Sequence, residues 1–269
     1  MMRSLWTAAS GMIAQQTNLD TISNNLSNIN TTGYKTEAVN FKSLLYQTMQ
    51  RNSYDSTGEP KPVGAQVGLG VRPAAIVSDF TQGALLESSG AFDYAIQGEG
   101  FFQVRLDDGS IGYTRNGSFN VSITDNGMAL TDSNGYPVLD TNGNPITFAG
   151  DIDSSKLSVD QYGNFMYPDA TGNAKLMGIQ IGLATFPNPA GLERTSDTIM
   201  KESPASGAPR TSTADQLGSK IVSGRLEGSN VQAVDEMVNM IVAQRAYEMN
   251  SKAITASDEM LQQANNLRS

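Results

Sequence analysis

Apolar residues near the start of the chain recur every seven positions, in two rows offset by three. Within positions 4–30 the rows are Leu5, Met12, Leu19 and Leu26, and Ala8, Gln15, Ile22 and Ile29. Two interleaved rows form a single seam along a helix, the pattern that supports coiled-coil packing. Gly33 is placed to end the helix with a left-handed cap. The pattern therefore predicts a long N-terminal helix with one packing seam.

The other faces of this helix carry almost no charge. Between positions 4 and 34 the one charged residue is Asp20, and the other polar residues are Ser, Thr, Asn and Gln. A solvated helix normally carries charges on its outer face. Burial within the helix's own domain would explain the pattern. So would packing among copies of itself, where uncharged groups avoid the desolvation of ions. The length of the seam and its amide flanks favour the second interpretation.

A matching pattern closes the chain. Ser229 and Asn230 can cap a helix whose first turn holds Asp235 and Glu236, near the positive end of the dipole. Its apolar seam is Met240, Tyr247, Ile254 and Leu261, widened by Val234, Met237, Val238 and Ile241. The companion row is polar and comprises Gln244, Ser251 and Asp258. Neither helix is stable alone in water, so we expect the terminal helices to pair with each other and with neighbouring molecules.

The expected assembly interface follows these two seams and includes amides beside the apolar rows. Its residues are Leu5, Met12, Leu19, Ile22, Asn25, Leu26, Ile29, Met237, Met240, Ile241, Gln244, Tyr247, Ile254 and Leu261.

The middle of the chain consists of short apolar or alternating runs separated by turn dipeptides. Asn-Gly and Asp-Gly favour the type I′ turns that join antiparallel strands. They stand at 108–109, 116–117, 126–127, 134–135 and 142–143, with further glycine turns at 162–163 and 171–172. Gly98 and Gly100 permit a sharp turn before Phe101 and Phe102 enter a strand that we expect in the core. The spacing predicts a meander, barrel or sandwich.

These patterns predict an α+β fold. Long N- and C-terminal helices would pair in a coiled-coil-like inner layer, with a central all-β, antiparallel and turn-rich domain outside. We expect a helical assembly domain (1–35 and 229–269), an extended excursion (36–75), the β-rich domain (76–203) and a return linker or strand (204–228).

Composition narrows the possible functions. The 269-residue chain has a formal net charge of −9 and no cluster of Lys and Arg, so a nucleic-acid role has no electrostatic support. Cysteine and histidine are absent, which excludes disulfides and removes the commonest general base and transition-metal ligand. Apolar runs are shorter than the roughly 18 residues of a membrane span. Ser4, Thr7 and Gly11 interrupt the N-terminal stretch, so we interpret it as mature protein and not as a signal peptide.

Three patterns could suggest ligand or reaction chemistry. Gly64, Gly68 and Gly70 lack the flanking strand and helix that a nucleotide-binding loop needs. The run from Asp140 lacks the glycine and glutamate of a calcium-binding EF-hand loop. Carboxylates in the turns could form an acid/base pair for glycan cleavage, but aspartate is favoured in turns for its backbone bonding. We therefore expect no cofactor, no metal and no catalytic residue.

Three separated segments resemble the family of flagellar rod, hook and hook-associated proteins. Positions 18–35, 95–102 and 230–252 resemble its N-terminal signature, the start of its central domain and its closing helix. In the first segment the characteristic positions hold Asn24, Asn25, Asn28, Thr32, Gly33 and Tyr34. Positions 2–8 and the run at 44–49, with the insertion after it, resemble the distal-rod branch of the family.

The resemblance implies a structural subunit of the flagellar distal rod, not an enzyme. Such a subunit polymerises into a rigid, hollow helical shaft that transmits torque and surrounds the export channel. The implied partners are copies of itself, other rod proteins on the proximal side, hook protein on the distal side and ring proteins around the rod. Nucleic acid and direct membrane insertion are not implied. The subunit would reach the basal body in the cell envelope by type III export, without a cleaved signal peptide.

Other functions remain as alternatives. Within the family, the chain could be a proximal-rod subunit. Outside it, the alternatives are a secreted β-rich adhesin and a carboxylate-based peptidoglycan hydrolase. Straight hollow filaments of the purified protein would favour the rod, whereas glycan release that depends on one carboxylate would favour the hydrolase.

Overall fold

The computed structural model describes residues 2–50, 65–124, 127–149, 152, 156–169, 173–196 and 198–267. The chain forms two compact units. The helical unit comprises Met1–Ser27, Glu37–Val77 and Gln232–Ser269, and the β unit comprises Asn28–Thr36 and Ser78–Val231. The chain therefore passes from one unit to the other after Ser27, Thr36, Val77 and Val231.

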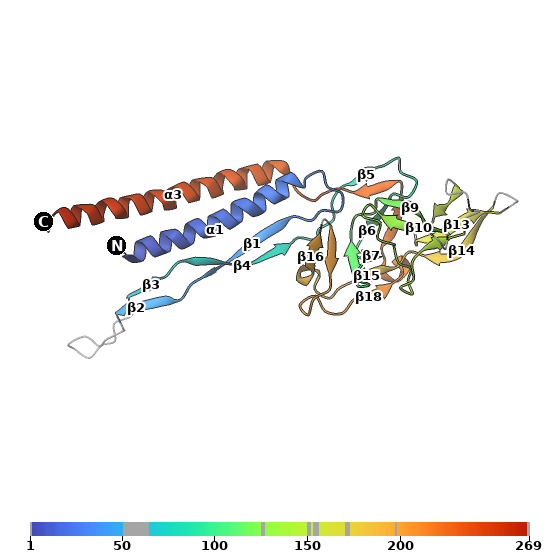
Figure 1. Cartoon of the computed structure of the whole chain (residues 1–269), viewed down its shortest axis with the longest axis horizontal. Coiled ribbons are helices and arrows are strands. Elements are labelled where there is room, and N and C mark those ends of the chain that lie inside the picture. Colours follow the sequence, from blue (N-terminus) through green and yellow to red (C-terminus); the bar gives the residue numbers. More distant parts are fainter. Residues whose placement is uncertain are drawn as a thin grey trace. The chain divides into compact units, whose positions relative to one another are not determined.

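Two long helices lie side by side in the helical unit (Figure 1). They are α1 (Met2–Ser27) and α3 (Ala233–Asn266). Small residues let the two backbones approach closely. A Cβ atom added at Gly11 would lie 2.9 Å from the side-chain nitrogen of Asn250, and the Oγ atoms of Ser4 and Ser257 are 3.3 Å apart. The predicted pairing of the terminal helices is confirmed.

The ends of the predicted helices are wrong. α1 ends at Ser27 and α3 begins at Ala233, so both helices are shorter than the patterns at 4–30 and 229–269 predict. The polar companion row of the α3 seam, Gln244, Ser251 and Asp258, is exposed, and the buried row, which the pattern did not identify, is Glu236, Ala243 and Ser257. Alanine and serine are small enough to allow close helix packing, although a hydrophobic pattern does not mark them.

A two-stranded ribbon completes the helical unit (Figure 1). In it, β1 (Glu37–Ser43) pairs with β4 (Val71–Ser78), and β2 (Tyr46–Gln50) pairs antiparallel with β3 (Ala65–Gly68). Positions 51–64 of the expected excursion, including Gly64, lie outside the described residues. The side chain of Asn25 ties α1 to the start of the ribbon. Its Nδ2 donates to the carbonyl oxygen of Glu37 over 2.8 Å, and its Oδ1 accepts from the Glu37 N–H at 2.9 Å.

Short antiparallel strands build the β unit. Its largest sheet has the order β16-β17-β8-β7-β15-β18, and smaller sheets are β11-β10-β9, β12-β13-β14, β19-β6 and β20-β5. The bounds are β5 (Leu85–Glu87), β6 (Tyr94–Gln97), β7 (Phe101–Arg105), β8 (Ile111–Thr114), β9 (Phe119–Thr124), β10 (Gly127–Asp132), β11 (Thr147–Phe148), β12 (Ser158–Val159), β13 (Asn164–Pro168), β14 (Ala174–Gln180), β15 (Leu183–Thr185), β16 (Glu193–Ser196), β17 (Ile199–Lys201), β18 (Arg210–Ser212), β19 (Lys220–Ser223) and β20 (Arg225–Glu227). The short helices η2 (Pro189–Gly191) and α2 (Ala214–Leu217) join them. The predicted central antiparallel region is confirmed.

The strand that follows Gly98 and Gly100 lies in the core, as the sequence predicts. These glycines have φ angles of 117° and 124°, a region that favours glycine. Phe102 is fully buried, and its ring meets that of Phe119 edge-on at a centroid distance of 5.1 Å. Aromatic packing of this kind fixes the start of β7 in the β unit.

The turns are present, but their predicted type is wrong at several positions. At the β7–β8 hairpin the N–H of Gly109 donates to Leu106, and the N–H of Leu106 donates to Ser110. Three residues therefore form the loop, and its last, Gly109, has a φ of 79°. The same pattern recurs with Gly135, Gly143 and Gly163. A three-residue loop ending in a left-handed glycine suits the twist of a hairpin as well as a type I′ turn does.

Positions 204–228, expected as a return linker or strand, hold β18, α2, β19 and β20 within the β unit. In the part of the chain that the structure describes, no helix has the length and apolar character needed to cross a membrane.

Candidate functional site

Among the described residues, no cluster of three or more carboxylates could hold a metal ion. The most elaborate polar arrangement lies in the β unit, where the chain arrives from α1 and the ribbon and departs toward α3. We call it the junction. It comprises positions 31–36, 79–83 and 227–230 together with Arg115 and Arg194. The segments that it holds together continue into α1, the ribbon and α3. For this reason we take the junction as the candidate functional site.

A buried carboxylate stands at the centre of the junction. Glu227 is 1% exposed. Its Oε1 accepts hydrogen bonds from Lys35 Nζ at 2.6 Å and from the Gly83 N–H at 3.0 Å. Its Oε2 accepts from Arg115 Nη1 at 3.0 Å. Two cations therefore share one carboxylate away from water, an arrangement in which each charge depends on the others.

Lys35 links the centre of the junction to a second segment. Its ammonium group also donates to the carbonyl oxygen of Thr81 over 2.7 Å. Burial lowers the pKa of Lys35, while the carboxylate of Glu227 opposes that shift. The ion pair thus offsets part of the cost of removing this cation from water.

Asn230 binds the other two segments of the junction with one side chain. Its Oδ1 accepts from the N–H of Thr36 at 2.8 Å and from the Thr36 hydroxyl at 2.7 Å. Its Nδ2 donates to the Asp79 carbonyl oxygen and to the Thr81 hydroxyl, each over 2.9 Å. Asn230 therefore does not cap α3 as predicted, because these contacts occupy both ends of its amide.

The segment after α1 enters the junction through a tight turn. The N–H of Gly33 donates to the Glu227 carbonyl oxygen over 2.8 Å. Gly33 has a φ of 71°, and a Cβ atom there would lie 2.5 Å from the backbone nitrogen of Asn116. Its predicted left-handed conformation is confirmed, but its predicted role as the cap of the first helix is wrong, because α1 already ends at Ser27. The close backbone contact is a second reason for glycine.

Arg194 holds the next two residues of this segment. Its guanidinium lies 4.8 Å from the centroid of the buried Tyr34 ring. Its Nη2 donates to the Lys35 carbonyl oxygen over 2.6 Å. Stacking and hydrogen bonding by one arginine thus order the backbone on which the Lys35 side chain depends.

The residues of the expected assembly interface differ in their burial within one chain. Those that are buried or half-buried are Leu5, Met12, Leu19, Ile22, Asn25, Leu26, Ile29, Met240, Ile254 and Leu261. Those that are exposed are Met237, Ile241, Gln244 and Tyr247. The first set includes contacts that the chain makes with itself, such as those of Asn25. The second set is available to other molecules.

Sequence reasoning did not identify the junction. Gly33, Tyr34 and Lys35 fall in the N-terminal signature. Glu227 and Arg115 belong to no motif, and nothing in the sequence around them indicates a buried ion pair. The separation of Glu227 from Lys35 is 192 residues. The one feature of the sequence that could have drawn attention to this site is that Lys35 is the first cation after Arg3.

Comparison with known proteins gives a consistent result along the whole chain. Family models match residues 5–35 (Flagella basal body rod protein), 95–167 (Flagellar hook protein FlgE/F/G D1 domain) and 222–267 (Flagellar basal body rod FlgEFG protein C-terminal). The Flagellar basal-body rod protein FlgG of Borreliella burgdorferi is 43% identical, over 100% of this chain and 99% of the relative. Proteins of the same name are 42% identical in Agrobacterium fabrum, over 96% of this chain and 97% of the relative, and 39% identical in Bacillus subtilis, over 100% of both.

Proposed function

The chain belongs to the flagellar basal-body rod protein family and is a structural subunit of the distal rod, and on that premise we propose how it works. Copies polymerise into a rigid, hollow helical shaft that transmits torque from motor to hook and surrounds the export channel. The paired helices α1 and α3 form the inner layer of this shaft, and the β unit forms its outer layer.

The outer face of α3 carries this proposal. Val234, Val238, Ile241 and Val242 are all more than half exposed, at 67%, 54%, 57% and 62%. Val234, Val238 and Ile241 stand about one turn apart on the face opposite the buried row of Ala243, and Val242 lies at the edge of that face. Contiguous exposed apolar side chains mark a surface that binds another molecule. A second copy is the simplest occupant, because unlike surfaces joined head to tail generate an open helical filament.

Further along α3 the same face becomes polar. Arg245, Glu248, Lys252 and Glu259 are exposed, and Arg245 pairs with Glu248 at 2.9 Å. Directly opposite Ala243 the apolar side chains therefore lie in the first turns of the helix. Met249 and Met260, at 65% and 50% exposure, continue the apolar surface along the edge that Val242 occupies. This apolar surface belongs to the assembly interface together with the exposed Met237, Gln244 and Tyr247.

We assign the partners and location from the family. Other rod proteins bind on the proximal side, hook protein on the distal side, and ring proteins surround the shaft within the cell envelope. The match of residues 95–167 to a domain named for a hook protein supports related surfaces in rod and hook. We expect the subunit to travel through the flagellar type III apparatus and to order its terminal helices on assembly.

A charge on the apolar face tests this function. Ile241→Asp should prevent filament formation by the purified protein, because a carboxylate would be buried between copies without a partner. Thr255→Asp is the matched control, since Thr255 is exposed on the polar part of α3. Electron micrographs should show filaments for the control alone, while near-ultraviolet circular dichroism shows that the β unit is folded in both variants. Normal filaments from Ile241→Asp would refute the assigned interface.

A further inference from the structure

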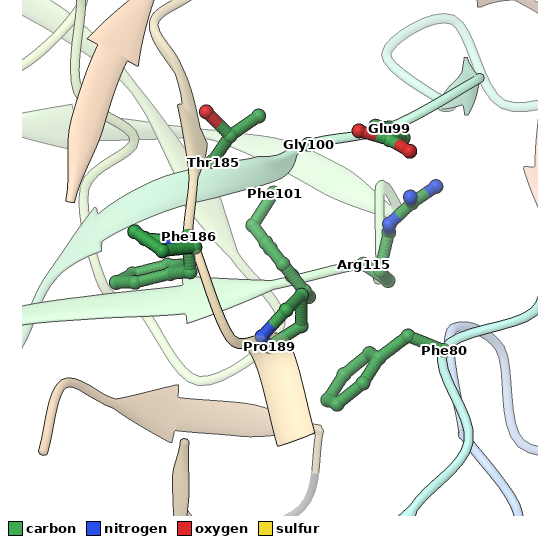
Figure 2. A pocket seen from close by; sticks show the side chains of 9 residues that line it. Phe80, Glu99, Gly100, Phe101, Arg115, Thr185, Phe186 and Pro189 are labelled. Atoms are coloured by element: carbon green, nitrogen blue, oxygen red, sulfur yellow. The ribbon is translucent and has the colours of Figure 1, made fainter. Parts of the chain in front are cut away.

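The β unit contains a pocket beside the junction. Its volume is about 270 Å³, and it opens where the start of β7 meets the ends of β8 and β15. The residues used here are Phe80, Phe101, Phe186, Pro187, Pro189 and Arg115. Figure 2 shows Phe186 toward one end of the pocket and Arg115 with Glu99 toward the other. The Phe101 ring meets Phe80 and Phe186 at centroid distances of 5.4 and 5.9 Å, so the apolar wall is packed in place.

Arg115 gives the pocket an unsatisfied donor. The residue is 4% exposed. Its Nη1 binds Glu227 and its Nη2 donates to the Gly98 carbonyl oxygen over 2.8 Å, but its buried Nε has no hydrogen-bond partner among the described residues. Buried donors are normally paired, so this one points to a group that is not part of the single chain.

An uncharged acceptor suits this end of the pocket. Lys35 and Arg115 share the carboxylate of Glu227, and the carboxylate of Glu99 also lines the pocket. A segment of a second copy can supply both an apolar side chain for the aromatic wall and a backbone carbonyl oxygen for Arg115 Nε.

The β unit also displays an apolar side chain that fits such a pocket. Ile123 is 87% exposed, more than Leu176 at 61% or Leu86 at 54%. It stands next to the end of β9, at the far end of the hairpin with β10, where it pairs with Met128. Neither strand lines the pocket. The apolar side chain and the pocket are therefore separate surfaces of one unit.

We propose that Ile123 of one copy occupies the Phe80–Phe101–Phe186 pocket of the next copy, where a neighbouring backbone carbonyl accepts from Arg115 Nε. This proposal rests on the proposed polymer and names one of its contacts. A protruding apolar group and a pocket elsewhere on the same molecule make a heterologous contact, which does not close on itself and propagates as a filament.

Cysteine cross-linking tests the contact, because the native chain has no cysteine. Thr185 lines the pocket, so the double variant Ile123→Cys/Thr185→Cys should form disulfides between copies when filaments are oxidised. A ladder of covalent oligomers on a non-reducing gel is the expected result. Leu176→Cys/Thr185→Cys is the matched control and should give no ladder. Filaments that form normally but give equal ladders for both variants, or none, would overturn the contact while leaving the polymer intact.

A second variant measures the contribution of the contact without cross-linking. Ile123→Ser should raise the critical concentration for polymerisation about tenfold, as expected for the loss of one buried aliphatic side chain. Leu176→Ser should leave it unchanged. If both serine variants polymerise like the native chain, the pocket has another role. If the native chain forms no filament at all, the proposed polymer and this contact within it are both refuted.

Discussion

Glu227 is the shared counter-ion of two buried cations. Its bonds to Lys35 and Arg115 are 2.6 and 3.0 Å long. Removing one member of such a group leaves the others as buried charges without a partner, which costs far more than an exposed ion pair contributes. The junction therefore depends on a single side chain.

Replacing that side chain should destabilise the β unit. We expect Glu227→Gln to lower the free energy of unfolding by about 3–5 kcal/mol, because Lys35 and Arg115 lose their counter-charge. Urea denaturation followed by tyrosine circular dichroism would report on the β unit. Trp6, the one tryptophan of the chain, lies in α1 and reports on the helical unit.

The matched control is Glu87→Gln. Its carboxylate is 3.6 Å from Arg225, and the Glu87 side chain is 87% exposed. This change should alter the free energy of unfolding by no more than about 0.5 kcal/mol. Equal effects of the two glutamine variants would show that Glu227 contributes no more than a surface ion pair.

The sequence around Glu227 does not reveal that its carboxylate is buried between two cations. Glu227 ends a short strand, and nothing local distinguishes it from Glu87, which also ends a strand that pairs with its own. The role of Glu227 depends on its burial and on its partners Lys35 and Arg115, which are distant in the sequence. By contrast, glycines in turns were predictable, because a left-handed backbone selects glycine wherever the chain reverses.

Among the elements, the two helices and their pairing follow from the heptad rows, because apolar periodicity directly reflects which face is covered. The buried row at Ala243 and Ser257 does not follow from it, since small and polar residues pack there through close approach of the backbones. The helix ends also differ from the pattern. Asn230 is a residue type that commonly caps helices, but its side chain binds Thr36 and Asp79 and does not cap α3.

The turn after α1 offers a test of how tightly this element is held. Gly33→Ala should destabilise the β unit by roughly twice as much as Gly109→Ala, judged by urea denaturation. Both positions are left-handed, with φ angles of 71° and 79°, so both variants lose about 1–2 kcal/mol for the conformation itself. At Gly33 the added Cβ also meets backbone atoms, whereas at Gly109 no atom lies within 4 Å. Losses of equal size would mean that the backbone contact at Gly33 relaxes freely.

For the whole molecule, the α+β class, the terminal helices and the central antiparallel strands were predictable from pattern alone. The family was predictable from three resembling segments. The pairing of β1 with β4 and of β2 with β3 was not. Val67, Leu69 and Val71 alternate with glycine, but alternation marks a strand without identifying its partner. The junction was unpredictable for the related reason that it is assembled from segments far apart in the chain.

The claim that the chain is the subunit of a hollow shaft is tested most directly by a helical reconstruction of filaments grown from the purified protein. The account predicts straight filaments in which α1 and α3 line a central channel, the apolar face of α3 meets a neighbouring copy, and the β unit lies outside. Closed rings, or filaments with the β unit around the channel, would contradict it.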